Sequence, residues 1–287
     1  MVAYIIAYSS DSKLDFQHIF EVFDSIQSRI ELPKFEEQLR TQELQRLHTG
    51  SSILLAKRNP IRNRLLAALP RKDYQKLLPV LEPVTLAFGE ILYEPHTRIR
   101  HVYFPSDCLV SMLTTVDSGR LGEFELIGSE GMIGICVALG IVVSPFRAVV
   151  QGGGTAMRMK TADFRRNFSA SAALRRESLL FTHLLMVQIA QTALCNRFHV
   201  AEQRMARWLL MTCDRVNSNE FRITQEFLAL MLGVRRVSVS VAKHRLQERK
   251  LIGYHRGAIT ILDHEGLVAA ACECYKTVKD AYAQAHA

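Results

Sequence analysis

One segment near the C-terminus, residues 221–262, constrains the fold more than any other part of the chain. It reads FRITQEFLALMLGVRRVSVSVAKHRLQERKLIGYHRGAITIL. Thr224 can cap a first helix that runs through Met231, and Gly233 tolerates the positive φ of a tight turn. A second helix is predicted from about Arg235 to Arg249, and the apolar runs after it predict a two-stranded hairpin. Two helices joined by a Gly-containing turn and followed by a β-wing predict a winged helix-turn-helix.

The same segment is strongly basic. It holds eight Lys or Arg against two acidic residues, a net charge of about +6 in a chain whose total is +8. Basic residues concentrated in one small module of this kind indicate double-stranded DNA as the partner. The second helix is predicted to lie in a major groove, with its base-reading side chains pointing away from the first helix. We expect base contacts from Arg236, Val237, Ser240, Val241 and His244, and phosphate contacts from Arg235, Lys243, Arg245 and Arg256, with Ser238 on the same surface.

Residues 82–160 carry a different pattern, in which short β-branched and aromatic runs alternate with Gly, Pro, Asp and Ser clusters. This pattern is typical of an antiparallel sandwich or barrel. Gly152-Gly153-Gly154 lacks the Gly-Lys-Ser/Thr ending of a phosphate loop and predicts a turn between strands. We therefore expect an α+β fold with four parts: an N-terminal extension (1–61), an antiparallel, jelly-roll-like β-roll domain (62–170), a long dimerisation helix (171–200) and a C-terminal winged helix-turn-helix domain (201–287).

The long helix is apolar on two faces. One stripe contains Phe181, Leu185, Ile189 and Cys195, and we expect the β-roll to cover it. The second stripe follows heptad-type steps of three and four and needs another surface. A second copy of the same helix is the economical cover, which predicts a two-fold homodimer. The predicted dimer contacts are Leu180, Leu184, Val187, Gln191, Leu194 and Phe198.

The order of these parts resembles the Crp/Fnr family of bacterial transcription regulators. The similarity is most specific over ITQEFLALMLGVRRVSVSVAKHRLQERKLI and the preceding AEQRMARWLL. It implies a homodimer that binds operator DNA, with phosphate contacts from Thr224 and Gln225 and base reading by Arg236. It also implies RNA polymerase as a further candidate partner. The family's acidic base reader is replaced by Val237 and its second basic reader by Val241, so we expect a different operator sequence.

The expected effector pocket departs from the family pattern. Cyclic-nucleotide-binding relatives hold the ribose with a Gly-Glu pair and the cyclic phosphate with an Arg-Ser/Thr pair. Here Gly134 is followed by Ile135, and Arg147 by Ala148. Without the acidic partner a buried ribose hydroxyl has no acceptor, so ordinary cyclic AMP binding is not expected. Arg147 has two interpretations, a phosphate contact or a strand arginine that faces solvent, and the effector is an unknown small molecule or none.

Two other function classes have less support. A sensor of cyclic nucleotides or other small molecules, whose main output is ligand binding, is the alternative, but both residue pairs that would support it are incomplete. The sequence has no H-E-x-x-H, G-x-S-x-G, Walker or G-x-G-x-x-G motif in a suitable context, so we expect no enzymatic activity.

The six cysteines are scattered, and only Cys272-Glu-Cys274 is a close pair. It lacks a second ligand pair, and no cysteine precedes Cys108, so we expect reduced thiols without a metal, an iron–sulfur cluster or another cofactor. Residues 178–196 lack Asp, Glu, Lys and Arg but are too polar for a membrane span. With no signal peptide recognised, we expect a cytoplasmic protein with no membrane partner.

Overall fold

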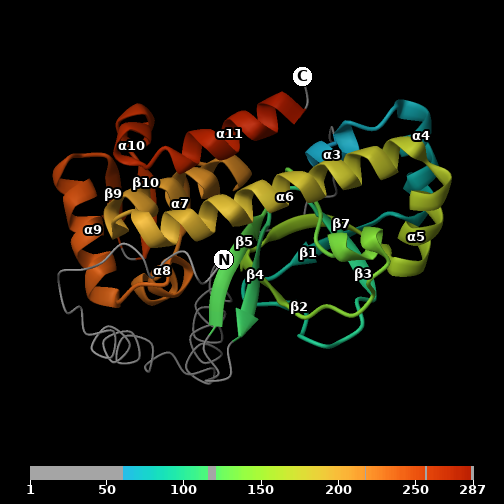
Figure 1. Ribbon diagram of the computed structural model, residues 1–287, viewed down its shortest axis with the longest axis horizontal. Coiled ribbons are helices and arrows are strands. Elements are labelled where there is room, and N and C mark those ends of the chain that lie inside the picture. The colour runs from blue at the N-terminus through green and yellow to red at the C-terminus, as the bar shows by residue number, and fades with distance from the viewer. Residues whose placement is uncertain (1–60, 116–120, 217, 256, 286–287) are drawn as a thin grey trace, which may run out of the picture.

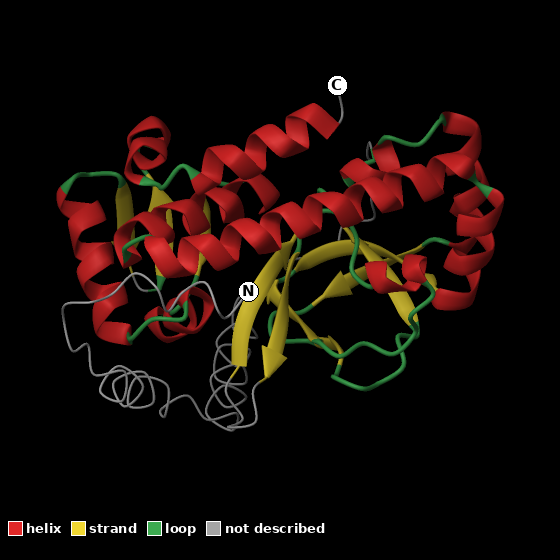
Figure 2. Ribbon diagram, viewed as in Figure 1, coloured by secondary structure: helices red, strands yellow, loops and turns green. Residues whose placement is uncertain are grey.

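The computed structural model describes residues 61–115, 121–216, 218–255 and 257–285 (Figure 1). The predicted N-terminal extension lies outside this part of the chain except for Ile61, and so does Arg256 of the predicted wing. In the described part the chain forms a β-roll, a long helix above it and a C-terminal helical domain with a small sheet (Figure 2). This is the expected α+β fold.

The β-roll consists of two antiparallel sheets. One has the strand order β1-β7-β3 and the other β2-β6-β4-β5. Burial does not alternate strictly along these strands: β6 is buried from Arg147 to Gln151, and β7 buries Ala156 and Met159, which are three residues apart. The strands are β1 (Glu82–Leu86), β2 (Ile91–Tyr93), β3 (His101–Pro105), β4 (Leu109–Thr115), β5 (Leu121–Ile127), β6 (Arg147–Gly152) and β7 (Gly154–Lys160). Short helices flank them: α3 (Arg64–Ala67), α4 (Arg71–Leu77), and the 3-10 helices η1 (Leu78–Val80) and η2 (Ile135–Leu139).

Three helices follow the roll: α5 (Thr161–Ala170), α6 (Ala172–Phe198) and α7 (Ala201–Val216). Ser171 begins α6, because its side chain accepts a hydrogen bond from the Leu174 amide at 3.1 Å. In Figure 1, α6 runs along the molecule from the roll to the C-terminal domain. It packs on β5, η2 and α11. Among the described residues, α6 is the one helix whose length and composition would allow it to cross a membrane.

The C-terminal domain contains the two predicted helices, α8 (Gln225–Leu232) and α9 (Arg236–Glu248). The predicted hairpin is β9 (Ile252–His255) with β10 (Ala258–Ile261). A strand that the sequence patterns did not indicate, β8 (Glu220–Arg222), pairs with the other side of β10. Two further helices, α10 (His264–Ala270) and α11 (Cys274–Ala285), end the described chain, and α11 lies alongside α6.

The roll has a hydrophobic core of its own, but some of its buried residues belong to the core of the C-terminal domain. Leu113 and Leu126 of the roll belong to the same buried cluster as Leu209 of α7 and Leu228 of α8. The α8 helix also packs directly on β5. Because this burial stabilises one relative position of the two domains, a change in the roll has a physical route to the helix-turn-helix.

Candidate DNA interface and its connection to the roll

The turn between α8 and α9 has the geometry that the sequence predicts. The Thr224 hydroxyl oxygen accepts a hydrogen bond from the Phe227 amide at 3.1 Å and so caps α8. Gly233 ends that helix with φ +58°, a left-handed conformation that a side chain would strain. Val239 and Leu246 of α9 are buried against the rest of the domain. These contacts fix which face of α9 points outward.

The outward face of α9 holds the predicted base readers. Val237 is 72% exposed, and Val241 one turn later is also exposed, so two valines are uncovered on this face. Arg236 and His244 are also exposed, and Ser240 is half-buried at the edge of the same face. With Val241, these residues line one open, solvent-facing surface along α9.

Several of the predicted contact residues already have partners within the protein. Arg236 Nη1 lies 2.7 Å from Glu226 Oε1 of α8. The Ser240 hydroxyl donates a hydrogen bond to Gln225 Oε1 at 2.7 Å. Any contact of Arg236 or Gln225 with DNA therefore requires these pairs to open or to share their donors.

The predicted phosphate contacts have varied surroundings. Arg235 is exposed at the N-cap of α9. The Lys243 ammonium lies 4.2 Å from the centre of the Tyr254 ring of the wing, a cation–π contact. Arg245 pairs with Glu202 of α7 at 3.5 Å, which holds it toward the body of the domain. Thr224 and Ser238 are half-buried.

The two predicted effector residues lie in the roll. Gly134 adopts φ +85° just before η2, and a Cβ built there would approach Val102 Cγ1 to 3.2 Å. Arg147 is buried, and its Nε lies 2.7 Å from Glu94 Oε2. The interpretation of Arg147 as a strand arginine that faces solvent is therefore wrong. Its Nη1 has no hydrogen-bond partner among the described residues.

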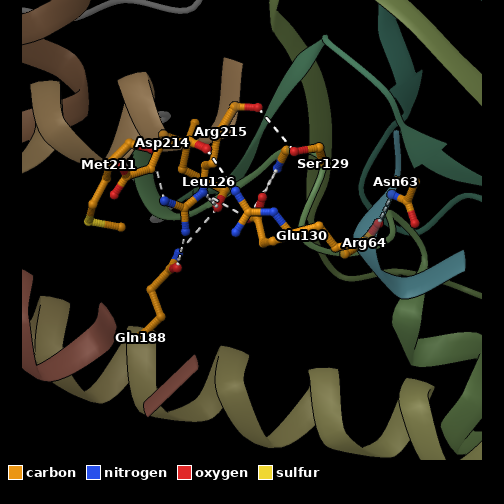
Figure 3. Close-up of polar contacts among 11 residues, drawn as sticks. Asn63, Arg64, Leu126, Ser129, Glu130, Gln188, Met211, Asp214 and Arg215 are labelled. Carbon is orange, nitrogen blue, oxygen red and sulfur yellow. Dashed lines mark hydrogen bonds and ion pairs between the residues drawn. The ribbon is translucent and has the colours of Figure 1, made fainter. Parts of the chain in front are cut away.

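A buried network around Arg215 joins the roll to the C-terminal domain (Figure 3). The Arg215 side chain, at the end of α7, lies 2.7 Å from Glu130 Oε1 and donates to the Leu126 carbonyl at 3.1 Å. Its Nη2 donates to Gln188 Oε1 of α6 at 2.6 Å. Removing one partner of a buried pair of this kind costs several kcal/mol, roughly 3–5. The sequence patterns did not reveal this site, because its members come from three separate segments.

Two carboxyl groups of β5 face the same junction. Glu123 accepts hydrogen bonds from Ser111 at 2.5 Å and from the Trp208 indole at 3.2 Å. Burial raises the pKa of Glu123 to about 7. Burial, with the nearby charge of Glu130, raises the pKa of Glu125 to about 8. Both groups therefore titrate near neutral pH at the contact between the domains.

The exposed face of α6 differs in part from the predicted dimer stripe. Leu194 and Phe198 are exposed, as a dimer contact requires before assembly. Leu184 is 2% exposed and packs inside its own chain, so it does not belong to that face. The remaining predicted contacts, Leu180, Val187 and Gln191, are half-buried.

The other stripe of α6 was predicted to face the roll. Phe181 and Leu185 do so, and Cys195 is also buried. Ile189 is instead 37% exposed and lies with Leu179 and Met186, two apolar residues that the heptad pattern did not indicate. The apolar surface that needs a cover is therefore rotated around α6 from its predicted position.

Comparisons with known proteins identify the C-terminal domain. Residues 203–270 match the family model of the Crp-like helix-turn-helix domain. A search of curated proteins finds no match. This segment includes α8, α9 and the β9–β10 wing, so the family match covers the whole surface described above.

Solved structures of the same fold cover most of the described chain. FixK2 from Bradyrhizobium japonicum is 15% identical with a TM-score of 0.59, over 67% of this chain and 98% of its own. The c-di-GMP responsive global regulator CLP of Xanthomonas campestris is 12% identical with a TM-score of 0.55, over 67% and 99%. A transcriptional regulator of the CRP family from Thermus thermophilus is 17% identical with a TM-score of 0.55, over 66% and 96%.

The fold and the α9 surface together define a class of protein. The C-terminal domain is a Crp-like helix-turn-helix domain, and the chain has the fold of Crp/Fnr regulators. The match to a Crp-like helix-turn-helix domain supports a DNA-binding transcription regulator.

Proposed function

We propose that the chain acts in the cytoplasm as a homodimer and places its two α9 helices in successive major grooves of an operator. The observation that carries this proposal is the outward face of α9, where Arg236 and the exposed Val237 stand beside polar and basic neighbours. Arg236 suits the O6 and N7 atoms of guanine, and a valine suits the methyl group of thymine. The basic residues around them supply phosphate contacts.

The dimer contact is assigned to the exposed apolar face of α6. Leu179, Met186, Ile189, Leu194 and Phe198 leave a large apolar surface uncovered along this helix. Surfaces of this kind mark interaction sites on soluble proteins. A second copy of α6 matches it in length and chemistry, and a two-fold pairing also orients the two DNA-binding domains symmetrically.

The effector is not cyclic AMP in this proposal. Ile135 provides no acceptor for a ribose, and the Arg147 guanidinium already pairs with Glu94. Control instead passes through the C-terminal core, which includes residues of the roll, and through the Arg215 network, and both link the roll to the C-terminal domain. A ligand or condition that favours one position of the roll shifts the population of dimers able to bind DNA.

Selection of DNA from a random pool by the full-length protein tests this function. We expect an enriched inverted repeat with half-sites about one helical turn, ~34 Å, apart. Such a repeat follows from a symmetric pair of recognition helices. If no sequence is enriched over the starting pool, the proposed operator binding is wrong.

A further inference from the structure

Four side chains with metal-binding atoms meet where α6 ends and α11 begins. Cys195 and His199 are four residues apart at the end of α6, and Cys272 and Cys274 precede and begin α11. One ligand atom from each residue lies within 4.8 Å of all the others. All three cysteines are buried. The expectation of scattered thiols without a second ligand pair is therefore wrong, because the fold supplies that pair from a helix 77 residues earlier.

We propose that Cys195, His199, Cys272 and Cys274 form a structural Zn²⁺ site that fastens α11 to the end of α6. A tetrahedral zinc ion with Zn–S bonds of about 2.3 Å and Zn–N bonds of about 2.05 Å needs S···S edges near ~3.8 Å and S···N edges near ~3.5 Å. The Cys195 and Cys272 sulfurs are 3.5 Å apart, and Cys274 Sγ is 3.4 Å from His199 Nδ1. These separations suit a single ion with four protein ligands.

The surroundings of the four ligands support a metal over simple packing of thiols. His199 offers Nδ1 to the cluster while its Nε2 lies 3.2 Å from the carboxylate of Glu273. Zinc-ligating histidines typically have such a carboxylate on their second nitrogen, which fixes the ring and its tautomer. The Gln191 amide donates to Cys274 Sγ at 3.1 Å, a hydrogen bond that stabilises a thiolate.

The charge of the site is also balanced. Three thiolates and a neutral histidine around Zn²⁺ carry a net charge of −1. Arg204 and Arg207 of α7 line the same cavity as Cys195 and supply positive charge beside it. Soft sulfur donors with one imidazole favour zinc over Mg²⁺ or Ca²⁺, which prefer oxygen ligands. Four protein donors leave no open position, so the ion has a structural role.

The position of the site suggests what the ion stabilises. Arg204 hydrogen-bonds to Asn196 at the end of α6 and to the carbonyl of Leu232, where α8 gives way to the turn. The α11 helix packs along α6 and also contacts α7. An ion bound here therefore secures the DNA-binding domain against the predicted dimerisation helix.

Metal analysis of the full-length protein, purified under reducing conditions and loaded with Zn²⁺, tests the proposal. We expect about one tightly held zinc per chain, and Co²⁺ in its place should give the intense visible bands of tetrahedral cobalt thiolate. Cys272→Ser should lose the metal, whereas Cys213→Ser, a buried cysteine outside the cluster, should keep it. Glu273→Gln should bind zinc about 10–100-fold more weakly, as measured by competition with a chromophoric chelator.

Because Glu273 is exposed, its variant is expected to fold even if Cys272→Ser does not. If Glu273→Gln binds zinc with unchanged affinity, His199 is not a zinc ligand oriented by Glu273, and the proposed four-ligand site is wrong. Absence of zinc and of cobalt thiolate bands from the reduced wild-type protein would overturn the proposal. So would equal loss of metal from Cys213→Ser, or a Cys195–Cys272 disulfide that persists under the reducing conditions.

Discussion

Among single residues, two neighbouring arginines have different surroundings. Arg236 lies on the outward face of α9 and forms an ion pair with Glu226. Arg235 precedes it at the N-cap of α9 and is exposed. If Arg236 reads a guanine, Arg236→Ala should cost about 1–3 kcal/mol on the selected operator and relax preference at one base position. Fluorescence anisotropy with the operator and with single-base variants measures both effects.

Arg235→Ala is the matched comparison. A phosphate contact carries no sequence information, so this variant should weaken operator and scrambled DNA about equally and reduce the salt slope by roughly one. Titrations over a salt series separate the two roles. The assignment of base reading to Arg236 would be contradicted if both variants lost sequence preference equally, or if both kept it.

The residues of the expected effector pocket give a second prediction. Because Arg147 pairs with Glu94 and Ile135 stands beside Gly134, cyclic AMP should leave both the melting temperature and the affinity for the operator unchanged. Thermal unfolding and isothermal titration calorimetry check this directly. Binding of cyclic AMP with a dissociation constant in the micromolar range would show that the roll holds a ribose through other residues.

Among the helices and strands, the contact between β5 and α7 predicts a dependence of stability on pH. Burial raises the pKa of Glu125 to about 8, and one of its oxygens has no hydrogen-bond partner among the described residues. The folded chain therefore binds more protons than the unfolded chain between about pH 4.5 and 8, so stability falls as pH rises through this window. Glu130, Glu123 and Arg215 share this environment and set the size of the effect.

Glu125→Gln should remove much of this slope. We expect the variant to be more stable than the wild type at pH 8 by roughly 1–3 kcal/mol, with the difference shrinking toward pH 5. Urea unfolding at several pH values measures it. Glu265→Gln changes an exposed carboxylate of α10 and should leave the slope nearly unaltered. A wild-type stability that rises steadily from pH 5 to 8, with Glu125→Gln unchanged, would contradict the assigned protonation.

The exposed apolar face of α6 leads to a prediction about dimerisation. Met186→Glu combined with Ile189→Glu places two charges on the apolar surface assigned to the dimer, and should weaken dimerisation by more than about tenfold. Light scattering should then report monomers, and the affinity for the operator should fall because dimerisation is lost. Val268→Glu changes an exposed apolar residue of α10 and serves as the control. An unchanged dimer in the double variant would place the interface elsewhere.

Over the complete fold, the helix-turn-helix is the part that the sequence predicted best. Thr224, Gly233 and the apolar spacing of α9 act locally, so their geometry follows from neighbouring residues. The rotation of the α6 face was missed because the heptad pattern does not say which stripe the roll and α11 cover. The Arg215 network and the Cys195 cluster join segments that are distant in the chain, and no local pattern reveals them.

The spacing between operator half-sites is the sharpest check on the proposed mode of DNA binding. A dimer with one α9 helix in each of two grooves is sensitive to the angle between half-sites, and about five added base pairs turn the second half-site by about 180°. We expect the affinity of the full-length protein for such a lengthened operator to fall to that for a single half-site, as measured by anisotropy at constant salt. Undiminished affinity for the lengthened operator would contradict a two-fold dimer that reads DNA through α9.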